Sequence, residues 1–222
     1  LLGLFVGLAF ATKVTVLPLI IPFSLTVLLL IFSGEFKSRK FPTFRRVIQV
    51  GTWASASTII AILVFLVCMP YALLDFGKFL SDITWETSIA RVAGRMPYTI
   101  QYIGSTPFWY ELRQSTLWGM GAPLGLVAWG GVVFAIYIAF RRRHVGDILL
   151  LSWIVPSFII LGSFEVKFLR YVFPIIPFVV LMGARLLLDG VDWVKRNCPK
   201  LTWVPILLVV LVVTGTAFYA VA

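Results

Sequence analysis

The sequence predicts an all-α fold, a polytopic transmembrane helix bundle of about seven spans with a partly helical loop on its outer face. Hydrophobic residues make up 60% of the chain and charged residues 13%, the mean hydropathy is +1.01, and apolar stretches alternate with polar connections throughout. A soluble domain has about 45–50% apolar and about 25% charged residues, so this composition is typical of a protein in a bilayer. We expect residues 1–222 to form a single membrane domain.

The apolar stretches define the expected spans. A membrane helix needs about 20 apolar residues to cross about 30 Å of hydrocarbon. The first stretch has only about a dozen before Lys13, so we expect a fragment that begins inside a helix and lacks the N-terminal spans and the first outer loop. The expected spans cover residues 1–12, 14–32, 47–69, 118–140, 148–164, 171–188 and 201–222.

Glycines mark two of these stretches. Gly3 and Gly7 form a GxxxG pair, and Gly119, Gly121 and Gly125 gather at the head of another span. Small residues at such spacing let the backbones of two membrane helices approach each other. We therefore expect close helix packing at both places.

Charged residues sort by alternate connections. Three of them, 33–46, 141–147 and 185–200, hold 12 of the 19 Lys and Arg but 4 of the 9 acids, and the positive-inside rule makes them cytoplasmic. The others, at Lys13, 71–117 and 165–170, hold the remaining 7 basic and 5 acidic residues. We expect a multi-pass cell-membrane protein whose functional face is extracytoplasmic.

The connection 71–117 is longer than a tether between two spans requires. Its apolar residues recur at roughly helical spacing between 74 and 92, which predicts a helix lying in the membrane interface. The loop after it, GRMPYTIQYIGSTPFWYELRQSTLWGMG, is rich in proline, glycine and aromatic residues. Long loops of this kind frequently carry function.

The motif EVKFLRY places two cations at the outer end of one span. Arg170 can bind two phosphate oxygens at once and Lys167 adds a point charge, so together they suit a phosphate at headgroup depth. Lys, Arg and Tyr are also common anchors at the ends of membrane helices. The motif alone favours neither interpretation.

Lys13 stands alone between two apolar stretches. A basic residue in this position is either a turn anchor or a functional charge that faces the bundle interior, and we favour the second interpretation. Lys13 would then bind the same anion as Lys167 and Arg170. These three side chains are the predicted phosphate ligands.

The aromatic loop holds the predicted substrate-binding side chains. Aromatic faces beside amide groups suit sugar rings, which offer an apolar CH face and a rim of hydroxyls, although an interfacial aromatic belt uses the same residue types. The candidates are Tyr98, Gln101, Tyr102 and Tyr110, with Tyr171 from the EVKFLRY motif.

No general base can be assigned from the sequence. The spacing of the carboxylates singles out none of Asp75, Asp82, Glu86, Glu111 and Glu165. We find no phosphate-binding loop, no Gly-x-Ser-x-Gly and no paired His or Cys, so we identify no cofactor and expect no metal site, while dependence on a divalent metal stays open. Because the basic residues lie beside apolar spans, we expect no nucleic-acid partner.

Three stretches carry a resemblance to a known family. They are GLAFATKVTVLPL, a glycine-containing helix that ends in a Thr-Lys pair, then PYTIQYIGSTPFWYEL followed by WGMGAPLG, and KFLRYVFPIIPF, an Arg-Tyr helix start with prolines. They resemble the lipid-carrier-dependent glycosyltransferases of the protein O-mannosyltransferase and aminoarabinose-transferase superfamily, which have the GT-C membrane fold. Together the three stretches are spread over most of the chain.

This resemblance implies transfer of a sugar from a polyprenyl-phosphate donor to an acceptor on the extracytoplasmic face. It implies that Lys13, Lys167 and Arg170 neutralise the phosphate as it leaves. The catalytic carboxylate of the family usually lies in the first outer loop, which this sequence does not contain, so we expect the fragment alone to be inactive. The sugar and the acceptor are not specified by these residues.

Two other functions stay open. A transporter or flippase for a lipid-linked or anionic substrate would require ionisable residues near the bilayer midplane or paired broken helices in repeated halves. The expected spans are instead almost free of charge, and the polar residues gather at one surface. A non-catalytic membrane scaffold would need neither the EVKFLRY motif nor the long aromatic loop.

Overall fold

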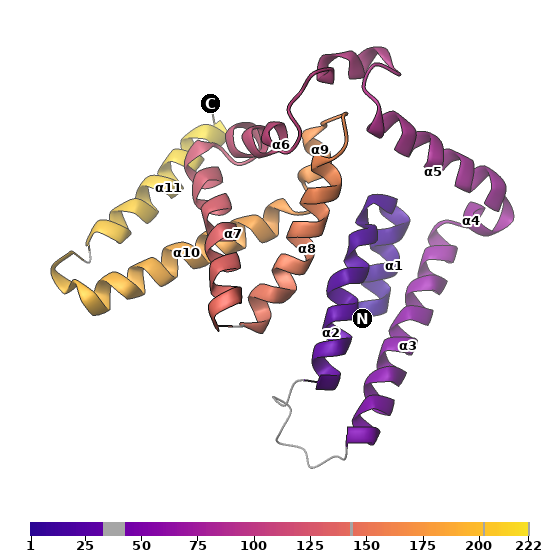
Figure 1. Ribbon diagram of the computed structural model, residues 1–222, viewed down its shortest axis with the longest axis horizontal. Helices are drawn as coiled ribbons and strands as arrows, with labels where there is room; N and C mark the ends of the chain where they lie inside the picture. The colour runs from indigo at the N-terminus through magenta and orange to yellow at the C-terminus, as the bar shows by residue number, and fades with distance from the viewer. Residues whose placement is uncertain (33–42, 143, 202, 222) are drawn as a thin grey trace. The chain divides into compact units, whose positions relative to one another are not determined.

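The computed structural model describes residues 1–32, 43–142, 144–201 and 203–221, and every regular element in that part of the chain is helical (Figure 1). The chain is an all-α polytopic membrane protein, as its composition predicts. It divides into two compact units, Leu1–Ile89 and Ala90–Ala222. The described helices that are long and apolar enough to cross a membrane are Thr15–Phe32, Phe44–Cys68, Ala122–Arg141, Val145–Gly162 and Trp203–Val221.

The first unit begins with an apolar helix pair. α1 (Leu2–Thr12) ends at Lys13, whose backbone is extended, and the 3₁₀ turn η1 (Val14–Leu19) leads into α2 (Ile20–Phe32). Pro18 lies inside η1 and has no N–H to donate, which fits the irregular start of this span. α3 (Thr43–Cys68) lies beside both α1 and α2 (Figure 1).

The GxxxG pair of α1 packs against α3, as the spacing predicts. A Cβ atom on Gly7 would lie 2.5 Å from the carbonyl oxygen of Ala61, and one on Gly3 would collide with the carbonyl oxygen of Ser57. Both glycines are buried, and they are the buried residues of α1. The missing side chains therefore allow the two backbones to touch.

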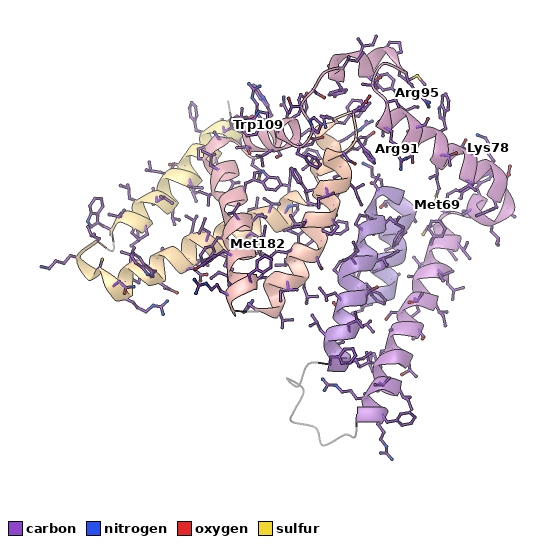
Figure 2. All side chains as sticks on the ribbon, in the orientation of Figure 1. Met69, Lys78, Arg91, Arg95, Trp109 and Met182 are labelled. Atoms are coloured by element: carbon purple, nitrogen blue, oxygen red, sulfur yellow. The ribbon has the colours of Figure 1, made fainter. Side chains whose placement is uncertain are left out.

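The helix expected between 74 and 92 is confirmed. α4 (Tyr71–Leu74) precedes α5 (Phe76–Arg91), and the rings of Phe79 and Phe65 meet edge to face at 6.1 Å, which ties α5 to α3. Lys78 and Asp82 form an ion pair on the exposed side of α5 (Figure 2). Phe76 and Leu80, one turn apart on one face, are also exposed, as is Trp85 on the opposite face. The position of α5 in the membrane interface stays a prediction.

The described part of the second unit contains four long helices and a series of short elements. The long helices are α7 (Ala122–Arg142), α8 (Val145–Gly162), α10 (Ile176–Asn197) and α11 (Trp203–Val221). The short elements are η3 (Pro97–Tyr102), α6 (Trp109–Gln114), the π-helical turn η4 (Ser115–Gly119), α9 (Leu169–Val172) and the 3₁₀ turn η5 (Pro199–Leu201). The candidate site lies on η3, α6 and α9.

The core of this unit lies between α7 and α10. A Cβ atom on Gly183 would lie 2.7 Å from the Cα of Ala128, and one on Gly131 would meet the backbone of Met182. Ala128 and Val179 are fully buried. Small residues on both helices therefore bring the two backbones together. Gly125, from the glycine group noted in the sequence, packs in the same way against Thr116, 2.6 Å from its Cα to the added Cβ.

The structure differs from the expected span at 171–188. α9 ends at Val172, and α10 begins only at Ile176, with Pro177 in its first turn, where the N–H groups lack intrahelical partners anyway. α10 then continues to Asn197 because its second half is amphipathic, with charged residues on one side. It is not among the helices that are apolar enough to span, and α1 is apolar but short.

An ion pair joins α8 to α10. Asp147, in the first turn of α8, is 1% exposed and pairs with Arg185. His144 Nδ1 lies 3.6 Å from the other carboxylate oxygen. The positive end of the α8 dipole also favours the carboxylate at this position.

The basic connection at 33–46 lies largely outside the described residues. The cytoplasmic position of all three basic connections stays a prediction, as does the single membrane domain.

Candidate functional site

The EVKFLRY motif and the aromatic loop meet in the second unit. The backbone N–H of Val166 donates to the carbonyl of Ala90 at 3.1 Å, and the N–H of Ala93 donates to Glu165 Oε2 at 2.8 Å. The second of these bonds joins residues 72 positions apart in the sequence. Together they hold the motif, which follows α8, against the end of α5 and the start of the aromatic loop.

Phe168 is the centre of an aromatic cluster. Its ring centroid lies 5.3 Å from that of Tyr102, 5.6 Å from Tyr171 and 6.1 Å from Tyr98. Tyr102 in turn lies 5.9 Å from Tyr110. Three of these four contacts are edge to face, the arrangement that the ring quadrupoles favour. We call these five aromatic residues, together with Arg170, the Phe168 cluster.

Arg170 lies on the exposed side of the Phe168 cluster. Its guanidinium carbon is 4.5 Å from the centroid of Phe168 and 5.6 Å from that of Tyr171, the geometry of a cation–π contact. None of the described carboxylates forms an ion pair with Arg170. A stacked guanidinium keeps its N–H groups at its edge, where they can bind a planar or tetrahedral anion.

Lys167 occupies a different environment, although it lies only three residues away. Its side chain is 1% exposed. Its ammonium donates to Glu111 Oε1 at 2.8 Å, to the carbonyl of Phe164 at 2.8 Å and to the carbonyl of Gly162 at 3.2 Å. Glu111, on α6, is 4% exposed, and its Oε2 has no hydrogen-bond partner among the described residues.

Tyr102 is the buried member of the Phe168 cluster. Burial raises the pKa of its phenol above the ordinary value, and the neighbouring Tyr110 raises it further, while the positive charge of Arg170 lowers it. The phenol is therefore neutral at physiological pH and can both donate and accept a hydrogen bond. Its other described neighbours include the ring of Phe168, Tyr171 and the side chain of Gln101.

The turn η3 fixes the two outer members of the predicted substrate site. Thr99 is fully buried, and its hydroxyl accepts from the N–H groups of Gly94 and Met96 and donates to the Met96 carbonyl. This network leaves Tyr98 54% exposed. Gln101 is also exposed, and its Nε2 donates to the Tyr98 carbonyl at 3.1 Å. Both side chains therefore lie on the surface, where a ligand can reach them.

Phe108 sets the direction in which α6 enters the site. It has φ 61°, in the left-handed region that L residues rarely adopt. Its ring packs where a Cβ of Gly162 would lie and is 6.2 Å from the ring of Phe158. This close contact stabilises an unfavourable backbone conformation one residue before α6 begins. Gly162 thus contributes both its carbonyl, to Lys167, and the space for Phe108.

Lys13 belongs to the first unit, so it is described apart from the Phe168 cluster. It is half-buried at the end of α1. The same unit contains a cavity of about 310 Å³ between α1, α2 and α3. Its lining is almost wholly apolar and includes Phe10, Leu19, Phe23 and Phe65, with Ser57 and Thr58 as the polar members.

The candidate carboxylates have different partners. Glu165 and Glu111 take part in the contacts given above, and Asp75 Oδ1 accepts from the N–H of Lys78 at 3.0 Å. Asp82 pairs with the side chain of Lys78, and Glu86 is exposed. In the part of the chain that the structure describes, no three His, Cys, Asp or Glu side chains gather in a way that could hold a metal ion.

The structure brings together five of the predicted site residues, Tyr98, Tyr102, Tyr110, Tyr171 and Arg170. The sequence analysis did not identify Phe168, the residue that they share. Phe168 lies between the cations Lys167 and Arg170, and only these charged residues of EVKFLRY suggested a binding role. It also missed the pairing of Lys167 with Glu111. That pair joins residues 56 positions apart, so no local sequence pattern predicts it.

Comparison with known proteins adds no relative. The chain matches no family model, and neither a curated protein nor a solved structure is detectably similar to it.

Proposed function

We propose that this membrane protein is part of a glycosyltransferase that moves a sugar from a polyprenyl-phosphate carrier to an acceptor on the extracytoplasmic face. The observation that carries the proposal is the Phe168 cluster, in which the exposed Arg170 lies over the ring of Phe168 and Phe168 in turn contacts the exposed Tyr98. A sugar phosphate offers an apolar ring face and an anion, and these two chemistries match the two kinds of side chain.

Each predicted site residue has a role in this proposal. Arg170 binds the phosphate, and Tyr98 and Tyr171 offer ring faces to the sugar. Gln101, Tyr102 and Tyr110 supply polar groups for its hydroxyls. Lys13 and Lys167 are the further predicted phosphate ligands, and the general base is not assigned to a residue. The acceptor is not specified by these side chains.

The apolar cavity of the first unit supports the proposal that the sugar donor carries a lipid chain. Its aliphatic and aromatic lining suits an isoprenoid chain, which has no polar group beyond its phosphate end. Lys13 lies in the chain between two lining residues, Phe10 and Leu19. A cation in this position has the sign that a lipid phosphate requires. The bilayer itself is the other partner of these apolar helices.

The distribution of charge favours this proposal over a transporter or flippase. Within the described helices that could cross a membrane, charged residues lie only near the ends, at Arg45, Arg46, Arg141 and Asp147. A transporter that binds an ion or an anion at the midplane usually carries ionisable residues there. Most charged residues of this chain instead lie outside these helices.

The decisive experiment follows consumption of a radiolabelled polyprenyl-phosphate sugar by the full-length protein in liposomes. Arg170→Ala should lower kcat/KM about 100-fold or more, because it removes a donor to the departing phosphate. Lys13→Ala should reduce turnover in the same way. Arg196→Ala and Lys78→Ala are the matched controls, since both cations are exposed and lie outside the cluster.

Two outcomes would contradict the proposal. The first is a well-folded parent that neither consumes nor binds any donor from a panel of sugars. The second is normal turnover by Arg170→Ala, which would remove the Phe168 cluster from the reaction. Movement of a labelled lipid between leaflets without transfer of the sugar would favour the flippase instead.

A further inference from the structure

The ammonium of Lys167 has no hydrogen left for a ligand. A lysine offers three donors, and the structure uses all three, on Glu111 Oε1 and on the carbonyls of Gly162 and Phe164. The side chain is also sealed from solvent, at 1% exposure. A phosphate could reach this ammonium only if the chain broke contacts that Lys167 already makes.

A phosphate at this place would also meet a negative charge. Glu111 lies 2.8 Å from the ammonium and is 4% exposed, so solvent screens its carboxylate very little. An anion that approached Lys167 would be repelled by Glu111 at close range. Arg170 offers the opposite situation, because it is exposed and none of the described carboxylates pairs with it.

The chain neighbours of the ion pair indicate what it does. Glu111 directly follows Tyr110, and Lys167 directly precedes Phe168. The rings of Tyr110 and Phe168 both contact the ring of Tyr102, at 5.9 and 5.3 Å, and both contacts are edge to face. The ion pair therefore fixes the two segments from which these rings project.

We propose that Lys167 and Glu111 are positioning residues, whose ion pair holds Phe168 and Arg170 in place against Tyr102 and Tyr110, and that the donor phosphate binds Arg170 without touching Lys167. This inference rests on the proposed function and changes the role of Lys167 within it. It also assigns a role to Glu111 other than that of a general base.

The first test is rescue by a second substitution. Breaking a buried ion pair from one side leaves an uncompensated charge, whereas replacing both partners with apolar residues of similar volume is often neutral. Lys167→Met and Glu111→Leu should each lower the melting temperature and lower donor kcat/KM about tenfold or more. The double variant should return the melting temperature to that of the parent and kcat/KM to within about threefold of it.

Arg170→Gln is the matched control for a phosphate ligand. It should raise the KM for the donor while leaving the melting temperature unchanged, and adding Glu111→Leu should not rescue it. A Lys167→Met/Glu111→Leu protein that melts like the parent but still fails to turn over the donor would overturn the proposal, because Lys167 would then contact the phosphate itself.

The second test needs no substrate. Val166 is 1% exposed and lies next to Lys167. In a protein with Cys68→Ser and Cys198→Ser, a maleimide should label Val166→Cys slowly. Adding Lys167→Met should make labelling about tenfold faster, because the segment opens, and adding Glu111→Leu as well should slow it again.

The two tests fail in different ways. If Lys167→Met leaves the labelling rate of Val166→Cys unchanged, the positioning role is rejected, whether or not the protein transfers sugar. A parent that binds and consumes no donor would instead reject the proposed function and the phosphate role of Arg170, and the labelling rates would still decide whether the ion pair positions the segment.

Discussion

The two ends of α8 both hold a buried acid paired with a base, but only one is joined to the aromatic cluster. At the Gly162 end, the side chains of Lys167 and Glu111 are 1% and 4% exposed. At the Val145 end, Asp147 is equally buried, but Arg185 is 27% exposed and also lies 3.6 Å from Asp189. The 18 residues of α8 make the helix about 27 Å long, close to the hydrocarbon thickness of a bilayer.

From this difference we infer that burial of a charge is a poor guide to a ligand site. What matters is the number of donors that the protein leaves unused. All three N–H donors of the Lys167 ammonium form hydrogen bonds inside the fold. Arg170, at the same end of α8, forms no ion pair with a described carboxylate. The cation that a ligand can reach is the one that the fold leaves stacked on an aromatic ring.

The largest expected effect compares the two pairs directly. Lys167→Met should lower the free energy of unfolding by about 3–5 kcal/mol, because Glu111 is left as an uncompensated buried carboxylate. Arg185→Met should cost less, about 1–3 kcal/mol, because the N-terminus of α8 and the nearby His144 still favour the charge of Asp147. Unfolding of the purified protein by denaturant, followed by circular dichroism, measures both values.

The prediction is that Lys167→Met destabilises the protein more than Arg185→Met does, and the opposite order would contradict it. If Arg185→Met destabilised the protein more than Lys167→Met, the pair at the Val145 end would be the one that holds the second unit together. The Arg170→Gln variant is a useful control, because it removes a cation of the same unit without leaving a buried partner.

An intermediate effect is expected from the glycine at each end of α8. A Cβ atom on Gly162 would collide with the ring of Phe108, so Gly162→Ala should destabilise by about 1–3 kcal/mol. A Cβ on Gly146 would meet only the exposed His144 ring, at 3.2 Å, and that ring can move. Gly146→Ala should therefore be neutral or stabilise by up to about 1 kcal/mol, the gain in helix propensity.

Both alanine variants can be measured in the same unfolding experiment. Equal effects at the two ends would mean that Phe108 leaves its site without cost. Phe108→Ala combined with Gly162→Ala checks this reason, because the second substitution should cost little once the ring is absent.

The smallest effect concerns the pH dependence at the Gly162 end. The pKa of Tyr102 is raised by burial and by Tyr110, so the folded state holds the phenolic proton more tightly than the unfolded state does. This contribution is complete below the ordinary tyrosine pKa of about 10 and is lost as the pH rises through the folded value. Tyr102→Phe should therefore flatten the fall in stability above about pH 10.

Melting temperatures measured across the alkaline range check this prediction. Parallel curves for the parent and Tyr102→Phe would contradict it, since the phenol would then titrate equally in both states. Arg185→Met serves as a reference, because it changes stability at the other end of α8 and should leave the alkaline slope of the parent intact.

Much of the site could be predicted from residue types, but its centre could not. Tyr98, Tyr102, Tyr110, Tyr171 and Arg170 stand out because aromatic rings and cations are conspicuous in a polar connection. Phe168 does not stand out in an apolar chain, where 19 phenylalanines share its chemistry. The pairing of Lys167 with Glu111 could not be predicted either. Residues 56 positions apart leave no local sequence pattern that would indicate their contact.

The sequence by itself determined the membrane class, the helical fold, the helix between 74 and 92 and the GxxxG contact of α1. These follow from composition and from spacing within one segment, which local physics decides. Only the tertiary structure decided that α10 begins at Ile176 and runs on as an amphipathic helix, and that EVKFLRY meets the aromatic loop. It also decided that Lys167 is enclosed while Arg170 is exposed, because burial and pairing depend on residues that lie far apart in the chain.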